Sequence, residues 1–151
     1  MFLLPSIEVN RDYYKEFDKW NKVKKFINER LYIPYYSERD VWWANIGVNI
    51  GYEEDGKGLE FTRPVLIARK LGCYSFLGIP LSTKLKVKEG YVRILLNDEY
   101  VSALILQIRV FSSKRLKKKM GKLDGKTFAR LKETLSCYYV WPPSFPKGER
   151  K

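Results

Sequence analysis

Residues 63–82, RPVLIARKLGCYSFLGIPLS, contain two runs of β-forming residues separated by a turn, and they decide the fold. Leu71-Gly72-Cys73-Tyr74 is a plausible four-residue turn, which would set Lys70 opposite Ser75 in an antiparallel hairpin. Pro64 is compatible with this arrangement because proline is tolerated at the first position of a strand. The stretch therefore predicts a β-hairpin.

The register of this hairpin brings two polar side chains together at its open end. In this register the residue numbers of each opposed pair sum to 145, as for Lys70 and Ser75, so Arg63 lies opposite Ser82. A register shifted by one would place Thr83 opposite Arg63 instead. Directly opposed side chains have Cβ atoms roughly 4.5–5.5 Å apart. An arginine offers forked donors to two phosphate oxygens, and a hydroxyl adds a third donor. This end of the hairpin is therefore a candidate phosphate site.

A carboxylate near this pair would complete an acid–base site. Glu53 lies in the glycine-rich loop that precedes the hairpin and could transfer a proton. Plainer interpretations stay open, because Arg63 could form a surface ion pair with Glu60 and Ser82 could be an ordinary turn residue.

Further strands are predicted on both sides of the hairpin. Residues 41–46 (VWWANI) precede it and are separated from it by a loop that runs from Gly51 to Gly58. Two more β-rich runs follow at residues 91–96 and 102–110. Five short strands within about 75 residues predict a mainly-β fold, a small and strongly bent sheet or barrel.

Helical spacing is found before and after the strands. Residues 13–31 predict an amphipathic helix, which ends before Pro34. Near the C-terminus, Ser112-Ser113 would cap a short helix that ends at Gly121, and Asp124 would cap a second helix. The apolar positions in these patterns are Phe17, Trp20, Val23, Ile27, Leu31, Leu116, Met120, Phe128, Leu131 and Leu135.

The length of 151 residues suits one domain with added segments. We predict a helical N-terminal extension (residues 1–36), a barrel domain with C-terminal helices (37–139) and a flexible proline-containing tail (140–151). The sequence shows no targeting signal and no apolar run long enough to span a bilayer. A soluble, cytoplasmic protein with no membrane contact is therefore expected.

The composition restricts the chemistry and the partners. The chain has 29 Lys+Arg against 17 Asp+Glu, a net charge of +12, which favours a polyanionic partner. It contains no histidine, so a histidine base and a histidine-ligated zinc site are excluded. Cys73 and Cys137 lie far apart with no metal-like spacing, which suggests a reduced, intracellular protein.

Positive charge is concentrated near the C-terminus, and this run predicts a polyanion-binding surface, although a solvated face is the plain alternative. Trp42 and Trp43 would fill the core on the two faces of a strand, whereas Tyr52 and Phe61 could do this or stack on unpaired bases. Between residues 109 and 132 the only acid is Asp124, against ten basic residues: Arg109, Lys114, Arg115, Lys117, Lys118, Lys119, Lys122, Lys126, Arg130 and Lys132.

An ordered set of short motifs resembles the MazF/PemK toxins of type II toxin–antitoxin systems, over about residues 38–136. RDVWWA (39–44) is similar to the family's opening strand, GYEE (51–54) to its G-S-E-Q loop, and TRPVLI (62–67) to its arginine–proline strand. PLSTK (80–84) is similar to a strand end with a conserved threonine. LQIR (106–109), KRL (114–116) and LD (123–124) follow the C-terminal pattern.

This resemblance implies an SH3-like β-barrel with a C-terminal helix, usually a homodimer. It implies a metal-independent, cofactor-free endoribonuclease that cuts single-stranded RNA at a short sequence and is neutralised by an acidic antitoxin. Arg63 and Ser82 would be the catalytic pair, and Glu53 is the motif glutamate. The residues expected to contact RNA are Tyr52, Lys57, Thr83, Lys84, Lys86, Gln107 and Arg109.

The resemblance suggests a mechanism in which the RNA 2′-OH attacks its own phosphate, leaving 2′,3′-cyclic phosphate and 5′-OH ends. Arg63 would stabilise the charge on the phosphoryl oxygens, Ser82 would hold one oxygen, and Glu53 would transfer the proton. The chain departs from the family in having Ser82 for threonine and Tyr52 for serine. It also has about five extra residues before Arg63, in a loop of the kind that tunes ligand choice.

Two other function classes remain open at this point. A barrel of this kind could bind RNA or an acidic protein without cutting, since one fold hosts many functions. Alternatively, a related toxin could block a protein target such as gyrase. RNA that stays intact on prolonged incubation would favour the first class, and a fall in gyrase activity the second.

Overall fold

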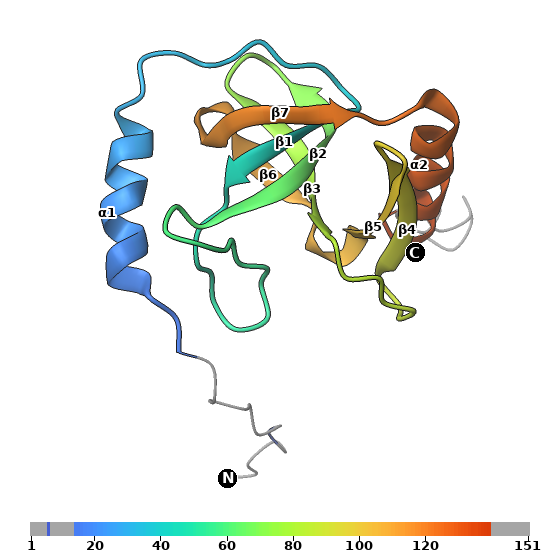
Figure 1. Cartoon of the computed structure of the whole chain (residues 1–151), viewed down its shortest axis with the longest axis horizontal. Helices are drawn as coiled ribbons and strands as arrows, with labels where there is room; N and C mark the ends of the chain where they lie inside the picture. The colour runs from blue at the N-terminus through green and yellow to red at the C-terminus, as the bar shows by residue number, and fades with distance from the viewer. Residues whose placement is uncertain (1–5, 7–13, 140–151) are drawn as a thin grey trace, which may run out of the picture.

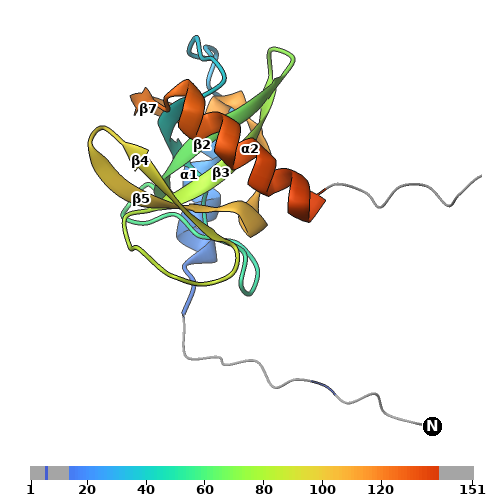
Figure 2. The ribbon, with the colours of Figure 1, turned by 90° about the vertical axis from the view of Figure 1, so that its right-hand side faces the viewer.

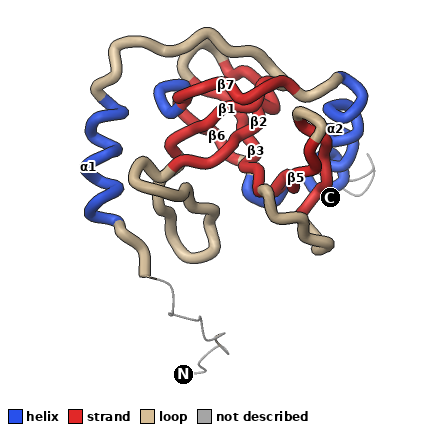
Figure 3. The backbone as a smooth tube through the Cα atoms, viewed as in Figure 1, coloured by secondary structure: helices blue, strands red, loops and turns tan. Residues whose placement is uncertain are grey.

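The computed structural model describes residue 6 and residues 14–139, and its strands form one seven-stranded antiparallel sheet (Figures 1 and 3). Helix α1 (Phe17–Asn28) precedes the sheet and α2 (Gly125–Tyr139) follows it. Short 3₁₀ turns occupy residues 105–107 and 113–115. The strands are β1 (Asp40–Asn45), β2 (Thr62–Leu71), β3 (Ser75–Ser82), β4 (Tyr91–Leu96), β5 (Glu99–Leu104), β6 (Arg109–Ser112) and β7 (Leu116–Lys122).

Strand β3 produces the strong bend of the sheet, because its two halves have different partners. Residues 75–78 pair with β6, whereas Leu81 and Ser82 pair with Ala103 and Ser102 of β5. The remaining order is β4-β5-β3-β2-β1-β7, and β4 and β7 stay at opposite edges. The mainly-β prediction with flanking helices is confirmed, and the sheet is bent but not closed.

Two apolar cores form because inward-facing residues alternate along the central strands. Leu66 packs on one side, in a cluster with Leu123, Phe128 and Leu131 from the α2 region. The neighbouring residues of β2 pack on the other side with Phe76 and Phe111. Helix α2 crosses the first of these faces (Figure 2).

The hairpin formed by β2 and β3 has the expected register at its open end. Val65 lies opposite Pro80, as the sum of 145 requires. The predicted turn is wrong, however: Leu71 pairs with Ser75, so only three residues form the turn. A β-bulge at Ala68 adds the missing residue, so the two errors cancel before the strand reaches Arg63.

Two predicted C-terminal elements are corrected. Residues 102–110 are not one strand, because β5 ends at residue 104 and a 3₁₀ turn carries the chain from one half of β3 to the other. The predicted short helix after Ser113 is instead β7. Leu116 and Met120 are four residues apart, which fits one face of a helix, but β7 pairs with β1 with two register shifts and the two side chains pack in different apolar clusters. The capping of α2 is as predicted, with Asp124 Oδ1 accepting from Thr127 N at 2.9 Å.

Helix α1 packs on the loop between β1 and β2. Its inner side chains, Trp20 and Ile27, join Val48 and Phe61 in a third apolar cluster. A Cβ at Gly47, whose φ is +83°, would collide with the Trp20 indole, so glycine permits this close approach. The N-terminal helix is thus confirmed, but it ends at Asn28.

Several side chains do not lie where the sequence predicted. Leu31 is 88% exposed, outside the helix. Trp42 is buried as expected, but Trp43 is 38% exposed. Of the two open cases, Phe61 is buried and Tyr52 is 80% exposed. Tyr13 and the predicted flexible tail lie outside the described residues.

Asp40, at the start of β1, is a buried carboxylate that links three segments. Its Oδ2 accepts from Ser37 N at 2.9 Å, and its Oδ1 lies 3.2 Å from Lys119 Nζ. Burial raises the pKa of this carboxyl, but the Ser37 N–H, the Lys119 ammonium and the Trp42 indole together hold it below its ordinary 3.8. Asp40 therefore stabilises the fold as an anion.

We expect Asp40→Asn to cost about 2 kcal/mol of unfolding free energy near neutral pH, the size of a charge-assisted hydrogen bond. The lowered pKa means that this contribution is present above 3.8 and is lost as pH falls through the folded-state value. Urea unfolding at about pH 7 and about pH 3 should therefore show a smaller acid-induced loss in Asp40→Asn than in the unmodified chain. Asp98→Asn, an exposed turn position, is the control; equal acid losses in Asp40→Asn and the unmodified chain would contradict this.

Candidate functional site

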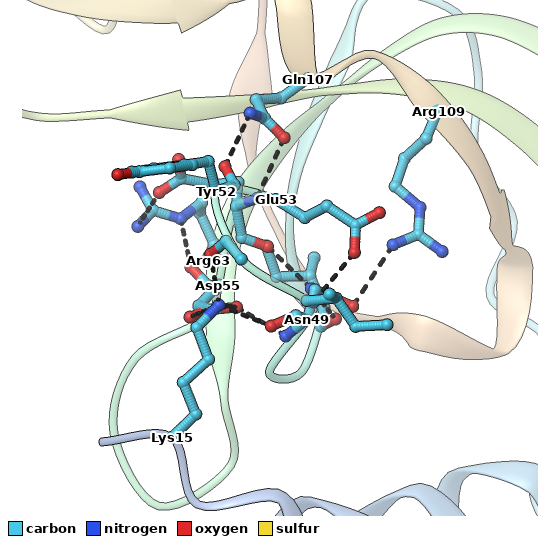
Figure 4. A network of polar contacts seen from close by, with 12 residues as sticks. Lys15, Asn49, Tyr52, Glu53, Asp55, Arg63, Gln107 and Arg109 are labelled. Carbon is cyan, nitrogen blue, oxygen red and sulfur yellow. Dashed lines mark hydrogen bonds and ion pairs between the residues drawn. The ribbon is translucent and has the colours of Figure 1, made fainter. Parts of the chain in front are cut away.

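Arg63, the second residue of β2, is the centre of the site and is only 8% exposed. Each of its three guanidinium nitrogens has a partner: Nε donates to Asp55 O at 2.8 Å, Nη1 donates to Leu81 O at 3.1 Å, and Nη2 lies 2.5 Å from Glu54 Oε1 (Figure 4). Burial of a guanidinium is costly unless its donors are satisfied. The loop before β2 supplies two of these three partners, so the loop and the arginine hold each other in place.

Lys15, next to α1, fixes the same loop from outside. Its ammonium donates to the carbonyls of Asn49 (2.5 Å) and Gly51 (2.8 Å), and lies 3.1 Å from Asp55 Oδ2. Asp55 Oδ1 in turn accepts from Asn49 N at 2.6 Å. The loop is therefore closed on itself and tied to the N-terminal extension (Figure 4).

Gln107 holds the opposite side of the loop. Its Nε2 donates to Tyr52 O at 3.1 Å, and its Oε1 accepts from Glu54 N at 3.0 Å. Both hydrogen bonds are to backbone, so the side chain positions the carboxylate that meets Arg63. The sequence motif indicated Gln107 as an RNA contact, whereas in the structure its side chain forms hydrogen bonds to the backbone of this loop.

Ser82 lies at the end of β3, next to the Leu81 carbonyl that Arg63 contacts. The Ser82 hydroxyl is half-buried and accepts from Lys84 N at 3.2 Å. Among the described residues, no hydrogen bond joins it to Arg63. The structure thus brings the two predicted residues to the same end of the hairpin, with their polar atoms bonded to other partners.

The two glutamates of the loop have different surroundings. Glu53 is exposed, and its Oε1 accepts from Ile50 N at 2.9 Å. Glu54, not Glu53, is the carboxylate beside Arg63. The sequence analysis missed Glu54; the signal was the second glutamate of Gly51-Tyr52-Glu53-Glu54, where the related motif has a neutral glutamine.

A cleft of about 720 Å³ opens beside this loop. Tyr52, Glu53, Gln107 and Arg109 line it, so three of the predicted RNA contacts face one space. Arg63 and Ser82 do not line the cleft, whereas Glu54 both lines it and contacts the Arg63 guanidinium.

The other predicted RNA contacts lie apart from this cleft. Lys57, Thr83 and Lys84 are exposed, and none of them lines the cleft. Lys86 stands 5.3 Å from the Tyr91 ring, at a separate hollow of about 420 Å³. The structure therefore groups only some of the predicted contacts with the candidate site.

The fold and the site define a class: a small, mainly-β protein of the SH3-like type, with an arginine under the loop that enters its second strand. A sequence profile described as "PemK-like, MazF-like toxin of type II toxin-antitoxin system" matches residues 37–138. The chain belongs to this toxin family.

Three solved structures share the fold. A crystal structure of MazF (Form-I) from Deinococcus radiodurans aligns with a TM-score of 0.54 at 15% identity, covering 71% of this chain and 96% of that one. An endoribonuclease in complex with its cognate antitoxin, from a mycobacterial species, aligns with a TM-score of 0.50 at 18% identity, covering 72% of this chain and 100% of that one. MazE–MazF (Form-II) from D. radiodurans gives 0.50 at 17% identity, covering 71% and 96%.

Two further observations concern sequence relatives and membrane-spanning helices. No curated protein sequence matches the chain. Within the described residues, neither helix has the length and apolar character needed to cross a membrane.

Proposed function

We propose that this chain is the toxin of a type II toxin–antitoxin pair and a metal-independent endoribonuclease that cuts single-stranded RNA, such as mRNA in the cytoplasm. The observation that supports this best is Arg63, a buried arginine at the entrance of β2, in a chain of the MazF-like family. Family members with the same fold include an endoribonuclease solved with its antitoxin.

The proposed chemistry is attack of the 2′-OH on the adjacent phosphate, which forms a 2′,3′-cyclic phosphate and breaks the bond to the 5′-oxygen; this oxygen takes a proton from water and leaves as a 5′-OH. Arg63 would stabilise the added negative charge, and Ser82 would hold a non-bridging oxygen. Glu53, which faces the cleft, would accept the 2′-OH proton. For the phosphate to reach Arg63, it must first take the place of the Glu54 carboxylate.

An acidic antitoxin and a second copy of the chain are the proposed partners. The net charge of +12 suits an acidic partner, and the mycobacterial endoribonuclease that shares the fold was solved in complex with its cognate antitoxin. Co-expression with an acidic antitoxin should inhibit the activity, and light scattering should give the mass of a dimer.

The direct test is to incubate the purified chain with single-stranded RNA in EDTA and to analyse the ends. We expect fragments with 2′,3′-cyclic phosphate and 5′-OH ends, and no cut at a position where the nucleotide carries a 2′-deoxy sugar. Cleavage at the 2′-deoxy position, or loss of cutting in EDTA, would contradict the mechanism.

One observation favours the runner-up, a toxin or binding module that does not cut RNA. Every nitrogen of Arg63 already has a partner and its charge is paired with Glu54, so a phosphate must compete with that carboxylate for the guanidinium while the loop is closed. RNA that is bound but stays intact would support a binding module, whereas inhibition of gyrase without any RNA effect would support a protein-directed toxin.

A further inference from the structure

A second cleft, of about 550 Å³, lies between α1 and the loop. Helix α1 contributes Phe17, Asn21 and Lys24 to its wall, and Arg109 and Arg115 approach from the β6–β7 side. The cleft shares Arg109 and two loop residues with the first cleft, so the two are adjacent. The part built by α1 lies outside the residues matched to the toxin family.

Three cationic side chains line this second cleft: Lys24, Arg109 and Arg115. Arg115 Nη1 donates to the carbonyls of Asn45 (3.0 Å) and Ile46 (3.3 Å), and its guanidinium lies 5.7 Å from the Trp20 ring. Among the described residues, neither Arg115 nor Arg109 forms an ion pair with a carboxylate. Burial lowers the pKa of Arg115, and the charge of Arg109 lowers it further. Two guanidinium groups that repel each other at one cleft are a suitable site for an anion.

The walls of this cleft also fit a nucleotide. Phe17 is 48% exposed on α1, and an exposed ring can stack on an unpaired base. Asp18 and Glu53 are the acids in the lining, so the cleft is not uniformly basic. Its position directly beside the first cleft favours the same RNA strand over a separate acidic peptide.

We propose that the cleft between α1 and the loop is a second RNA subsite, in which Lys24, Arg109 and Arg115 hold a backbone phosphate of the strand being cut. This inference rests on the proposed function, because it assumes that single-stranded RNA occupies the first cleft. It gives the N-terminal helix a role: α1 lengthens the bound stretch of RNA and strengthens the binding of longer substrates.

The test compares two lysines of α1 by charge reversal. Lys24 lines the cleft, whereas Lys22 is equally exposed on the same helix and does not line it. Binding is measured by fluorescence anisotropy with uncleavable 2′-O-methyl oligonucleotides of random sequence, four and twelve nucleotides long. We expect Lys24→Glu to weaken binding of the longer oligonucleotide about tenfold and to reduce the salt slope by about 0.7, one phosphate contact on a single strand.

The matched controls decide the interpretation. Lys22→Glu should change neither affinity, and Lys24→Glu should leave the short oligonucleotide unaffected. Equal effects of the two substitutions, or equal loss for both lengths, would overturn the subsite. If a poly-glutamate peptide, and not the oligonucleotide, requires Lys24, the cleft is a protein-binding site instead.

RNA cleavage separates this inference from the proposed function. If the unmodified chain cuts long RNA and Lys24→Glu does so with unchanged KM, the subsite fails and the nuclease stands. If the unmodified chain cuts nothing but its binding of the longer oligonucleotide still requires Lys24, the nuclease fails and the cleft remains an RNA-binding site.

Discussion

Arg63→Ala is expected to lower the rate of RNA cleavage about 10²- to 10³-fold, the usual effect of removing one preorganised donor to a transition-state oxyanion. The guanidinium lies under the loop at the end of the hairpin, held by Asp55, Leu81 and Glu54. Its charge would act in a site that is largely shielded from water, where electrostatic stabilisation is strongest. Single-turnover cleavage of an RNA oligonucleotide measures the effect.

Arg69→Ala is the matched control, because Arg69 is an exposed arginine on the same strand. It should cut at the unmodified rate. Arg63→Ala leaves Glu54 without its partner, so circular dichroism must first show that the variant is folded. A folded Arg63→Ala chain that cuts RNA at full rate would remove this site from the mechanism.

The two adjacent glutamates are expected to respond in opposite directions when each is changed to glutamine. Glu53→Gln should lower cleavage about 10²- to 10⁴-fold, since the amide cannot accept the 2′-OH proton. Its Oε1 can still accept from Ile50 N, so the loop should be retained. Glu54→Gln should raise cleavage about fivefold, because loss of a partly exposed ion pair worth about 1 kcal/mol releases Arg63.

Rates for both variants should be measured on one RNA, with thermal melting as the check on folding. A loss of activity in Glu54→Gln together with full activity in Glu53→Gln would reverse the assignment and make Glu54 the proton acceptor. Equal, unchanged rates would exclude both carboxylates from the proton transfer.

The fold was predictable where local patterns point to one structure. Asp124 and the apolar spacing after it predicted α2, and the β-rich runs predicted the central strands. Residues 112–121 were misread as a helix because Leu116 and Met120 are about one helical turn apart, and only pairing with β1 makes this segment a strand. A partner strand more than seventy positions away is not visible in a local window.

The candidate site was predictable only in part. The motifs indicated Arg63 and a loop carboxylate, but which of two adjacent glutamates meets the guanidinium depends on how the loop closes. That closure depends on Gln107 and Lys15, which lie far along the chain on opposite sides of the loop. Single-residue patterns contain no information about such distant contacts.

The bulge at Ala68 has a consequence for how this toxin tolerates change. With a three-residue turn alone, the hairpin would set Arg63 level with Thr83 and direct its side chain through the sheet to the opposite surface. The extra residue at Ala68 shifts the register by one, so that Arg63 lies on the same face of the sheet as it would with a four-residue turn. Deletion of Ala68 would therefore move Arg63 out of the candidate site without changing any residue of that site.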